Sequence, residues 1–499
     1  MTEPRRRPDV DSAEIDDPAA VLDLSTAGGR VIRGSILRAG GYLAGVLLSA
    51  VSAAVMIRHL GVVDWGRYVT VISLMTIVGG IGEAGTTSIG VREYATQTGR
   101  ERETLLRSLV GLRFALTAAG IVVAVVFTLA ADYPSTVVAG TGLAGVGLLL
   151  TVAQQTYAVP LTATLRLGVV AALDLLRQAA TVVAAVLLVV AGARLLAFLA
   201  IPIPVGVVVG AATVWLVRRQ MPLRPAFDAA VWRRVLGWTL AYSAAAAVAT
   251  VYVSITVVLT SLLASDTETG YYGASFRIFS VLAAIPLLLV GSAFPVVARA
   301  ASNDRDRLSY VVQRLFEIAV IFGMWMTIVT VLGAQFVIDV VAGAKFDPAV
   351  PVLQIQGVAL IGTFLSVTWG TTLLSLHRHT TLLVTNVVGL ATSIGLTFAL
   401  VPTLGAKGAA IATLVGELVL AALYMGVLFV RDRLAVSITV VPVVLAAAGA
   451  AFALALVPGL SGIALVAAAT VAYFVILFAF RALPVELLEA LVERRGFAA

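Results

Sequence analysis

The chain has 499 residues, of which 60% are hydrophobic and only 12% are charged. Soluble globular proteins carry about twice this charged fraction, so the composition excludes a soluble protein and predicts a membrane protein. The chain has no cysteine, which excludes disulfides and thiolate chemistry, and its three histidines leave little room for a multi-histidine metal centre. The net charge of +7 is informative mainly through the positions of the cations along the chain.

Residues 1–34 are polar and of mixed charge, which predicts a disordered tail. No short apolar core with a small-residue cleavage site precedes the first span, so no cleaved signal peptide is expected. From residue 36 onward, apolar stretches of about 20 residues recur, each long enough to cross a bilayer as a helix. The fourteen predicted spans are residues 36–57, 68–90, 109–131, 137–159, 168–190, 195–217, 238–262, 271–298, 315–337, 353–376, 381–402, 409–430, 436–456 and 461–480.

The positions of the cations predict the orientation of these spans in the membrane. With both termini inside, 27 of the 34 cations lie on the cytoplasmic side, counting Arg38 and Arg113 just inside the cytoplasmic ends of their spans; five lie on the outer side, and Arg177 and Arg277 fall deeper within spans. This excess follows the positive-inside rule and predicts a multi-pass protein of the cell membrane with both termini cytoplasmic. After the last span, residues 481–499 place Val485 and Leu488 on one face, which predicts an amphipathic helix at the cytoplasmic interface.

A weak repeat relates two halves of the chain. Between spans one and two the sequence reads Asp64-Trp65-Gly66-Arg67-Tyr68, and between spans seven and eight it reads Glu268-Thr269-Gly270-Tyr271-Tyr272. Each has an acid two residues before a glycine and a tyrosine two residues after it. Because the two sites are six spans apart, the halves share one orientation and would be related by an axis along the membrane normal. The predicted fold is therefore an all-α polytopic protein with an N-lobe (35–236, spans 1–6), a C-lobe (237–435, spans 7–12) and two further spans (436–480).

Polar residues repeat along one face of the first helix in each lobe. Arg38, Tyr42 and Ser49 follow helical spacing in span one, and Tyr242 and Ser243 begin a run of hydroxyl side chains in span seven. Small hydroxyl residues also serve close helix packing in membranes. Two such stripes at equivalent positions favour a polar cavity between the lobes.

Charged side chains within spans are costly and are functional candidates by default. Arg277, accompanied by Tyr272, has a guanidinium that offers two parallel donors to a phosphate, and so does Arg38 unless it reaches the membrane surface instead. Asp174 and Arg177 are three residues apart on one helix, which predicts a structural pair or an ion site. Single acids within spans are also candidates for binding a proton or a sodium ion; they are Glu83, Glu317 and Glu417.

Other chemistry has little support in the sequence. His377-Arg378-His379 falls in a short cytoplasmic turn where a metal site is not expected, and no glycine-rich loop ends in the lysine of a nucleotide-binding motif. The outer loops do not exceed about 15 residues, too short for the extramembrane loop of a membrane glycosyltransferase. No cofactor and no metal are expected, and neither is nucleic acid as a partner.

The sequence resembles the polysaccharide-biosynthesis flippases of the multidrug/oligosaccharidyl-lipid/polysaccharide exporter superfamily. The resemblance is carried, in order, by Leu60-Gly61, Asp64-Trp65-Gly66-Arg67-Tyr68, Ser73-Leu74, Gly82-Glu83-Ala84-Gly85, Val91-Arg92-Glu93-Tyr94-Ala95 and Gly405-Ala406-Lys407-Gly408-Ala409-Ala410-Ile411-Ala412-Thr413. Each motif is degenerate alone, but their order and spacing over residues 35–480 make the match fairly specific.

This resemblance implies movement of a polyprenyl-diphosphate-linked oligosaccharide from the inner to the outer leaflet by alternating access, without catalysis. It places phosphate binding on Arg38 and Arg277 and a cavity-lining role on Tyr42, Ser49, Glu83, Tyr242 and Ser243, and Tyr272 is expected to bind substrate because it accompanies Arg277. Arg92, at the cytoplasmic end of span two, is expected at an inner gate. A polysaccharide polymerase or glycosyltransferases are possible partners besides the lipid bilayer.

Two alternatives remain open from the sequence. A cation-coupled multidrug or metabolite antiporter of the same superfamily would depend on a proton or sodium ion bound at Glu83 or Asp174. A membrane glycan polymerase or ligase would need an essential acid or histidine on the outer face, where the short loops offer few.

Overall fold

The computed structural model describes residues 27–83, 86–96, 99–218, 225–303, 305–434, 436–457 and 462–483. Over these ranges the secondary structure is helical, without strands. The helices are α2 (Ala27–Glu83), α3 (Thr86–Thr96), α4 (Gly99–Ala130), α5 (Ser135–Tyr157), α6 (Val159–Ala163), α7 (Leu167–Val190), α8 (Leu195–Ala200), α9 (Pro202–Val217), α10 (Ala229–Leu263), α11 (Asp266–Asn303), α12 (Arg305–Val341), η2 (Ala344–Phe346), α13 (Ala349–Ser375), α14 (His379–Val430), α15 (Val440–Ala453), η3 (Leu454–Leu456) and α16 (Gly462–Ala479).

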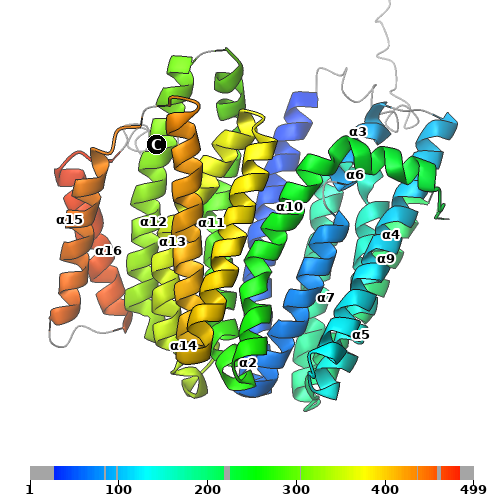
Figure 1. Cartoon of the computed structure of the whole chain (residues 1–499), viewed down its shortest axis with the longest axis horizontal. Helices are drawn as coiled ribbons and strands as arrows, with labels where there is room; N and C mark the ends of the chain where they lie inside the picture. The colour runs from blue at the N-terminus through cyan, green and yellow to red at the C-terminus, as the bar shows by residue number, and fades with distance from the viewer. Residues whose placement is uncertain are drawn as a thin grey trace, which may run out of the picture. The chain divides into compact units, whose positions relative to one another are not determined.

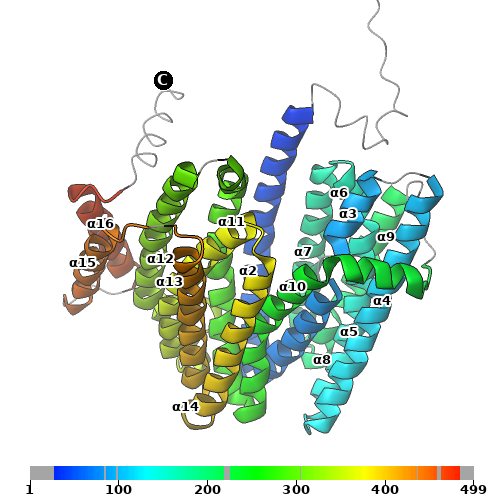
Figure 2. The same ribbon diagram turned by 45° about the horizontal axis from the view of Figure 1, so that its top comes forward.

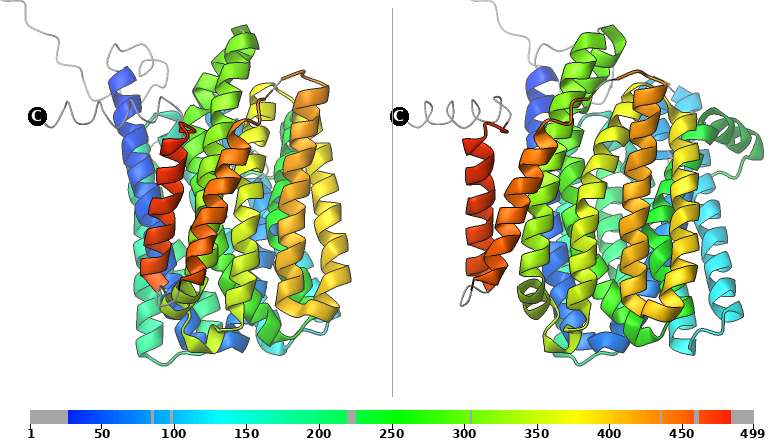
Figure 3. Two further views of the ribbon diagram at one scale, coloured as in Figure 1. Left: turned by 90° about the vertical axis from the view of Figure 1, so that its left-hand side faces the viewer. Right: turned by 60° about the vertical axis from the view of Figure 1, so that its left-hand side comes forward.

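Eleven helices in the described ranges are long and apolar enough to cross a membrane. Two of them, α2 and α14, reverse direction at Gly61 (φ 72°) and Gly405 (φ 55°), so each consists of two limbs (Figures 1 and 3). Only glycine adopts such a φ readily, which explains why both reversals occur at glycine. Counting both limbs of α2 and α14 and adding the shorter apolar helix α15 reproduces the fourteen predicted spans.

The N-terminal helix is longer than the sequence predicts. Helix α2 begins at Ala27, inside the segment 1–34 expected to be disordered. No proline follows Pro18 in that segment, so no residue there lacks the backbone N–H that a continuing helix needs, although Gly28 and Gly29 disfavour a helix. The rest of the predicted tail, residues 1–26, and the predicted amphipathic helix after the last span lie outside the described residues, and both stay predictions.

The chain divides into two compact units. The first contains residues up to 52 together with 81–130 and 138–243, and the second contains 53–80, 131–137 and the chain from 244 onward. The predicted lobe boundary at residue 236 and the pseudo-two-fold relation of the lobes stay predictions.

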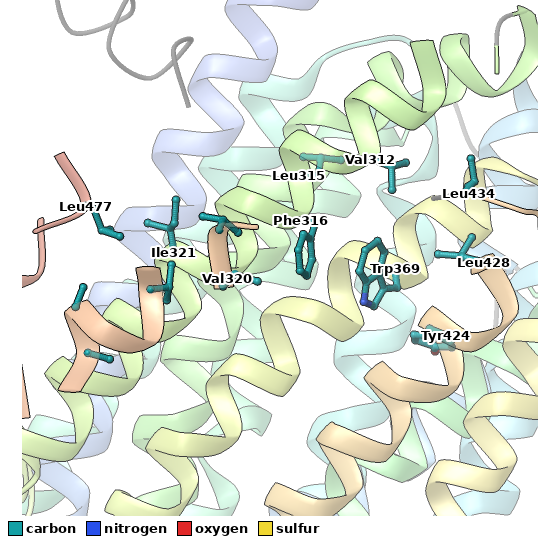
Figure 4. Packing of buried hydrophobic residues seen from close by; sticks show 14 of the residues in the cluster. Val312, Leu315, Phe316, Val320, Ile321, Trp369, Tyr424, Leu428, Leu434 and Leu477 are labelled. Atoms are coloured by element: carbon teal, nitrogen blue, oxygen red, sulfur yellow. The ribbon is translucent and has the colours of Figure 1, made fainter. Parts of the chain in front are cut away.

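The second unit is built around a continuous apolar core on α12. Phe316 on α12 stacks on Trp369 of α13 with ring centroids 5.5 Å apart, and Tyr424 and Leu428 of α14 belong to the same cluster (Figure 4). Helices α15 and α16 pack against each other and against α12 (Figure 2). Leu477 of α16 belongs to this core (Figure 4). The two last predicted spans are thereby attached to the second unit through α12.

The reversal in α14 explains the glycine motif of this segment. A Cβ at position 405 would collide with the carboxylate of Glu268, whose Oε2 accepts a hydrogen bond of 2.8 Å from the Ala406 backbone N–H. This carboxylate caps the second limb of α14, where a negative charge is favourable. A Cβ at position 408 would lie 3.0 Å from the backbone nitrogen of Val401 on the first limb. Both glycines are therefore required by close backbone approach.

Candidate functional site

The two turns related by the predicted repeat lie against each other in the second unit. A Cβ at Gly66 would lie 2.9 Å from the backbone nitrogen of Gly270 and still closer to the carbonyl oxygen of Asp266. A Cβ at Gly270 would in turn lie 2.8 Å from Cγ1 of Val62 and closer to its carbonyl oxygen. We call this mutual contact of Gly66 and Gly270, with Val62 and Asp266, the glycine seam. Backbone packs directly on backbone here, and no larger residue fits.

Polar contacts border the glycine seam. Arg67 Nε donates to Oδ2 of Asp266 over 2.8 Å, and its Nη1 lies 3.5 Å from Oδ1 of Asp64. Tyr133, in the turn between α4 and α5, shares a hydrogen bond of 2.7 Å with Ser261. Burial holds the pKa of the Tyr133 phenol above its ordinary value, so this hydroxyl stays protonated. The contact therefore combines tight backbone packing with charged and polar groups at its border.

Arg277 lies on α11 beyond the seam. Its side chain is half-buried, and its guanidinium interacts electrostatically with the hydroxyl of Tyr68. Asp266 and Arg277 are eleven residues apart, which is about 16 Å of helix, so Arg277 lies well inside the membrane-spanning part of α11. A guanidinium at this depth is a positive charge inside the membrane, which attracts an anionic group that enters there.

Tyr272, expected beside Arg277 as a substrate-binding residue, is wholly buried. Its hydroxyl shares a hydrogen bond of 2.9 Å with Thr413 on α14, and its ring stacks on Phe276. In this structure Tyr272 joins α11 to α14 and has no exposed surface for a ligand.

Several predicted residues cannot be placed by their side chains. The side chains of Arg38, Tyr42, Tyr242 and Ser243 lie outside the described part of the structure, so their expected roles stay predictions. Ser49 on α2 is described and half-buried.

Glu83 ends α2, and its side chain is 50% exposed. Its Oε1 accepts a hydrogen bond of 3.0 Å from Thr87 on α3. A guanidinium that sequence reasoning missed, Arg113 on α4, lies 3.9 Å from Oε2 and is 1% exposed. Arg113 is grouped with the cytoplasmic cations in the sequence-based topology, but the structure buries it within the helix bundle. The sequence does contain a feature that indicates this burial, because Arg113 lies inside the predicted span 109–131, four residues after its start.

The remaining charged candidates form local pairs. Arg92 is 70% exposed and donates to the buried carboxylate of its neighbour Glu93 over 2.8 Å. Arg177 forms an ion pair with Asp174, as their spacing on α7 predicts, and the side chain of Asp174 is exposed. Their expected roles at a gate or an ion site stay predictions.

Glu417 on α14 is a buried acid of the second unit. Hydroxyl groups surround its carboxylate: Ser366 donates to Oε2 over 3.2 Å, and Thr363 and Tyr252 also hydrogen-bond to it. No arginine or lysine pairs with Glu417 within the described ranges. A buried acid held by neutral donors is a candidate for binding a proton or a small cation.

No cluster of three metal-ligating side chains is found among the residues that the structure describes. His377 and His379 flank the turn before α14, where Arg378 forms an ion pair with Asp432.

Comparison with known proteins identifies the family. The sequence family described as "Polysaccharide biosynthesis protein" matches residues 55–351, more than half of the chain. No curated protein matches the sequence. The fold is similar to that of the lipid II flippase MurJ in an inward closed conformation, with a TM-score of 0.70 and 13% identity over 89% of this chain and 98% of that one.

Two further transporters have similar folds. One is an inward-facing multidrug resistance MATE transporter of the MOP superfamily, with a TM-score of 0.64 and 14% identity over 78% of this chain and 94% of that one. The other is a MOP superfamily transporter from Pyrococcus furiosus, with a TM-score of 0.54 and 15% identity over 86% of this chain and 99% of that one. The chain therefore belongs to the polysaccharide biosynthesis protein family and is a multi-pass membrane protein whose fold is similar to that of these solved structures.

Proposed function

We propose that the protein moves a polyprenyl-diphosphate-linked oligosaccharide from the inner to the outer leaflet of the cytoplasmic membrane by alternating access. The observation that carries this proposal is Arg277, a half-buried guanidinium within a membrane helix of a polysaccharide biosynthesis protein. Together with Arg38 it replaces the hydration of the diphosphate, because a guanidinium bonds phosphate oxygens in pairs.

The glycine seam is the contact that must separate in this cycle. In the predicted orientation it lies at the outer side, so in this proposal its closure blocks release of the substrate toward that side. Separation releases the oligosaccharide outward while the prenyl chain stays in lipid. The route must be hydrated, since each sugar hydroxyl left unsatisfied in hydrocarbon costs several kcal/mol.

The membrane potential supplies a driving force for this movement. A diphosphate diester carries about two negative charges, and each charge is worth about 2.3 kcal/mol per 100 mV. An inside-negative potential therefore favours outward movement by roughly 4–5 kcal/mol. Potential-driven uniport is sufficient on these numbers.

Depletion of the protein in its host, followed by extraction of lipid-linked oligosaccharides, tests the proposal whatever the identity of the sugar. The expected result is accumulation of one such lipid on the inner leaflet and loss of a surface polysaccharide. Unchanged glycolipids would refute the proposal.

Glu417 favours a second candidate, a cation-coupled antiporter of the same superfamily. Its carboxylate is buried and held by hydroxyl groups. This candidate requires that export of a small cationic compound depend on a proton or sodium gradient and that Glu417→Gln abolish this dependence. The same depletion strain distinguishes the two, because the antiporter predicts altered sensitivity to small cationic compounds with normal glycolipids.

A further inference from the structure

Among the described side chains of the first unit, Arg113 is the most deeply buried cation. Its side chain is 1% exposed, although it lies on a membrane-spanning helix. Charged groups in such positions are rare, and they mark functional sites or structural pairs. The contacts of Arg113 decide between these two roles.

The guanidinium is held mainly by neutral groups. Nη1 donates to Oγ1 of Thr87 over 3.0 Å, and Nη2 donates to Oε1 of Gln155 on α5 over 3.4 Å. The carboxylate of Glu83 is farther away, at 3.9 Å, and Nε of Arg113 has no hydrogen-bond partner in the described structure. A pair that served only structure would close to hydrogen-bond distance, as Arg314 and Glu317 do at 2.8 Å on α12.

Glu83 is the exposed member of this cluster. Thr87 links the two charges, because its hydroxyl receives a bond from Arg113 and donates one to Oε1 of Glu83. This arrangement fixes the carboxylate at the junction of α2 and α3 and leaves half of the side chain accessible. The accessible oxygens can accept hydrogen bonds from a ligand.

The charge of the cluster selects the kind of ligand. Arg113 neutralises Glu83 as a pair, which weakens attraction for a cation and also weakens repulsion of a diphosphate. The cluster therefore favours a ligand with neutral hydrogen-bond donors, and two neighbouring hydroxyl groups of a sugar can donate to the two oxygens of the Glu83 carboxylate. Glu83 lies twenty-two residues from the reversal at Gly61, about 33 Å along the helix, which is the full thickness of the hydrocarbon core. In the predicted orientation this is the cytoplasmic side, where the sugars enter.

We propose that Glu83 binds hydroxyl groups of the sugar nearest the diphosphate, and that Arg113 is its positioning residue. This inference rests on the proposed function and assigns the sugar-recognising group within it. In this assignment, arginine side chains bind the diphosphate and the carboxylate of Glu83 recognises the sugar.

Two lipids test the assignment with the full-length protein in detergent. One is the lipid-linked oligosaccharide extracted from the host, and the other is polyprenyl diphosphate without sugar. We expect Glu83→Gln to weaken binding of the sugar-bearing lipid by about tenfold or more, the effect of one charge-assisted hydrogen bond, and to leave the sugar-free lipid unaffected. Arg113→Gln should do the same, with partial rescue in Arg113→Lys. Equal weakening of both lipids, or of neither, would overturn the assignment.

The double variant Glu83→Gln/Arg113→Gln distinguishes sugar recognition from a purely structural role. Removing both charges should restore the thermal stability lost in Arg113→Gln without restoring binding of the sugar-bearing lipid. Recovery of both would show that the pair is structural. The control is Glu103→Gln/Arg107→Gln, an exposed pair on the same helix at 3.8 Å, which should change neither property. If the unaltered protein binds neither lipid, the proposed function fails, and that outcome differs from every outcome described for the variants.

Discussion

Gly66→Ala perturbs the glycine seam at its tightest point. The added methyl group would lie 2.9 Å from the backbone nitrogen of Gly270 and closer to the carbonyl of Asp266, and backbone atoms cannot rotate aside as a flexible side chain can. Overpacking of this kind costs about 1–3 kcal/mol. The methyl group acts only while the seam is closed, so the ratio of open to closed molecules should rise roughly 5- to 150-fold.

The absence of cysteine makes this shift measurable. Thr269 lies beside the seam and is wholly buried, and a Thr269→Cys reporter would be the only thiol in the protein. A membrane-impermeant maleimide added from outside should label the reporter slowly in the parent and faster, within the same 5- to 150-fold range, after Gly66→Ala. The same substitution should slow net transport, since closure of the seam is one step of the cycle.

The matched control is Gly395→Ala on the first limb of α14, where an added Cβ meets no atom within 4 Å. It should leave labelling unchanged. An unchanged labelling rate in Gly66→Ala, with normal abundance, would show that the seam does not separate and would refute the gating part of the proposed function.

Four further predictions test other parts of the structure. Arg277→Ala should lower flipping of the sugar-linked lipid in proteoliposomes at least tenfold, with partial recovery in Arg277→Lys, because one phosphate-binding guanidinium is lost. Asp266→Asn removes a partly exposed ion pair worth about 0–1 kcal/mol, so labelling of the Thr269→Cys reporter should rise by no more than about fivefold. Imposing an inside-negative potential of about 100 mV on proteoliposomes should favour outward movement, and an inside-positive potential should oppose it. Gly405→Ala should lower the melting temperature, because φ is 55° there and a Cβ collides with Glu268.

The apolar helical segments and the places where the chain reverses were predictable from the sequence. Apolar length alone separates the spans, and the two reversals fall at Gly61 and Gly405, both within the motifs that carry the family resemblance. The structure adds the reason for the second motif, because Gly405 and Gly408 are required by the cap from Glu268 and by contact with the first limb.

The candidate site was less predictable, because it depends on which helices meet. Arg113 falls in a predicted span, but only the packing of α4 against Thr87 and Gln155 shows that it is buried. Tyrosine is a residue type that often lines cavities, yet Tyr272 hydrogen-bonds to Thr413 and lies in the contact between α11 and α14. Helical periodicity shows which face of its own helix a residue lies on, but it does not show which other helix packs against that face.

The chemistry of the glycine seam suits a contact that must open and close repeatedly. A seam of interdigitated large side chains would need many rotamers to reorder at each closure, and it would expose a large apolar surface when open. Gly66 and Gly270 have no rotamers to reorder, and they have no apolar side chain to expose when the seam opens. The border pair of Arg67 and Asp266 is partly exposed, so it gains water on opening and adds little to the barrier. Closure is therefore specific in shape but weak in energy, which allows a driving force of a few kcal/mol to reverse it.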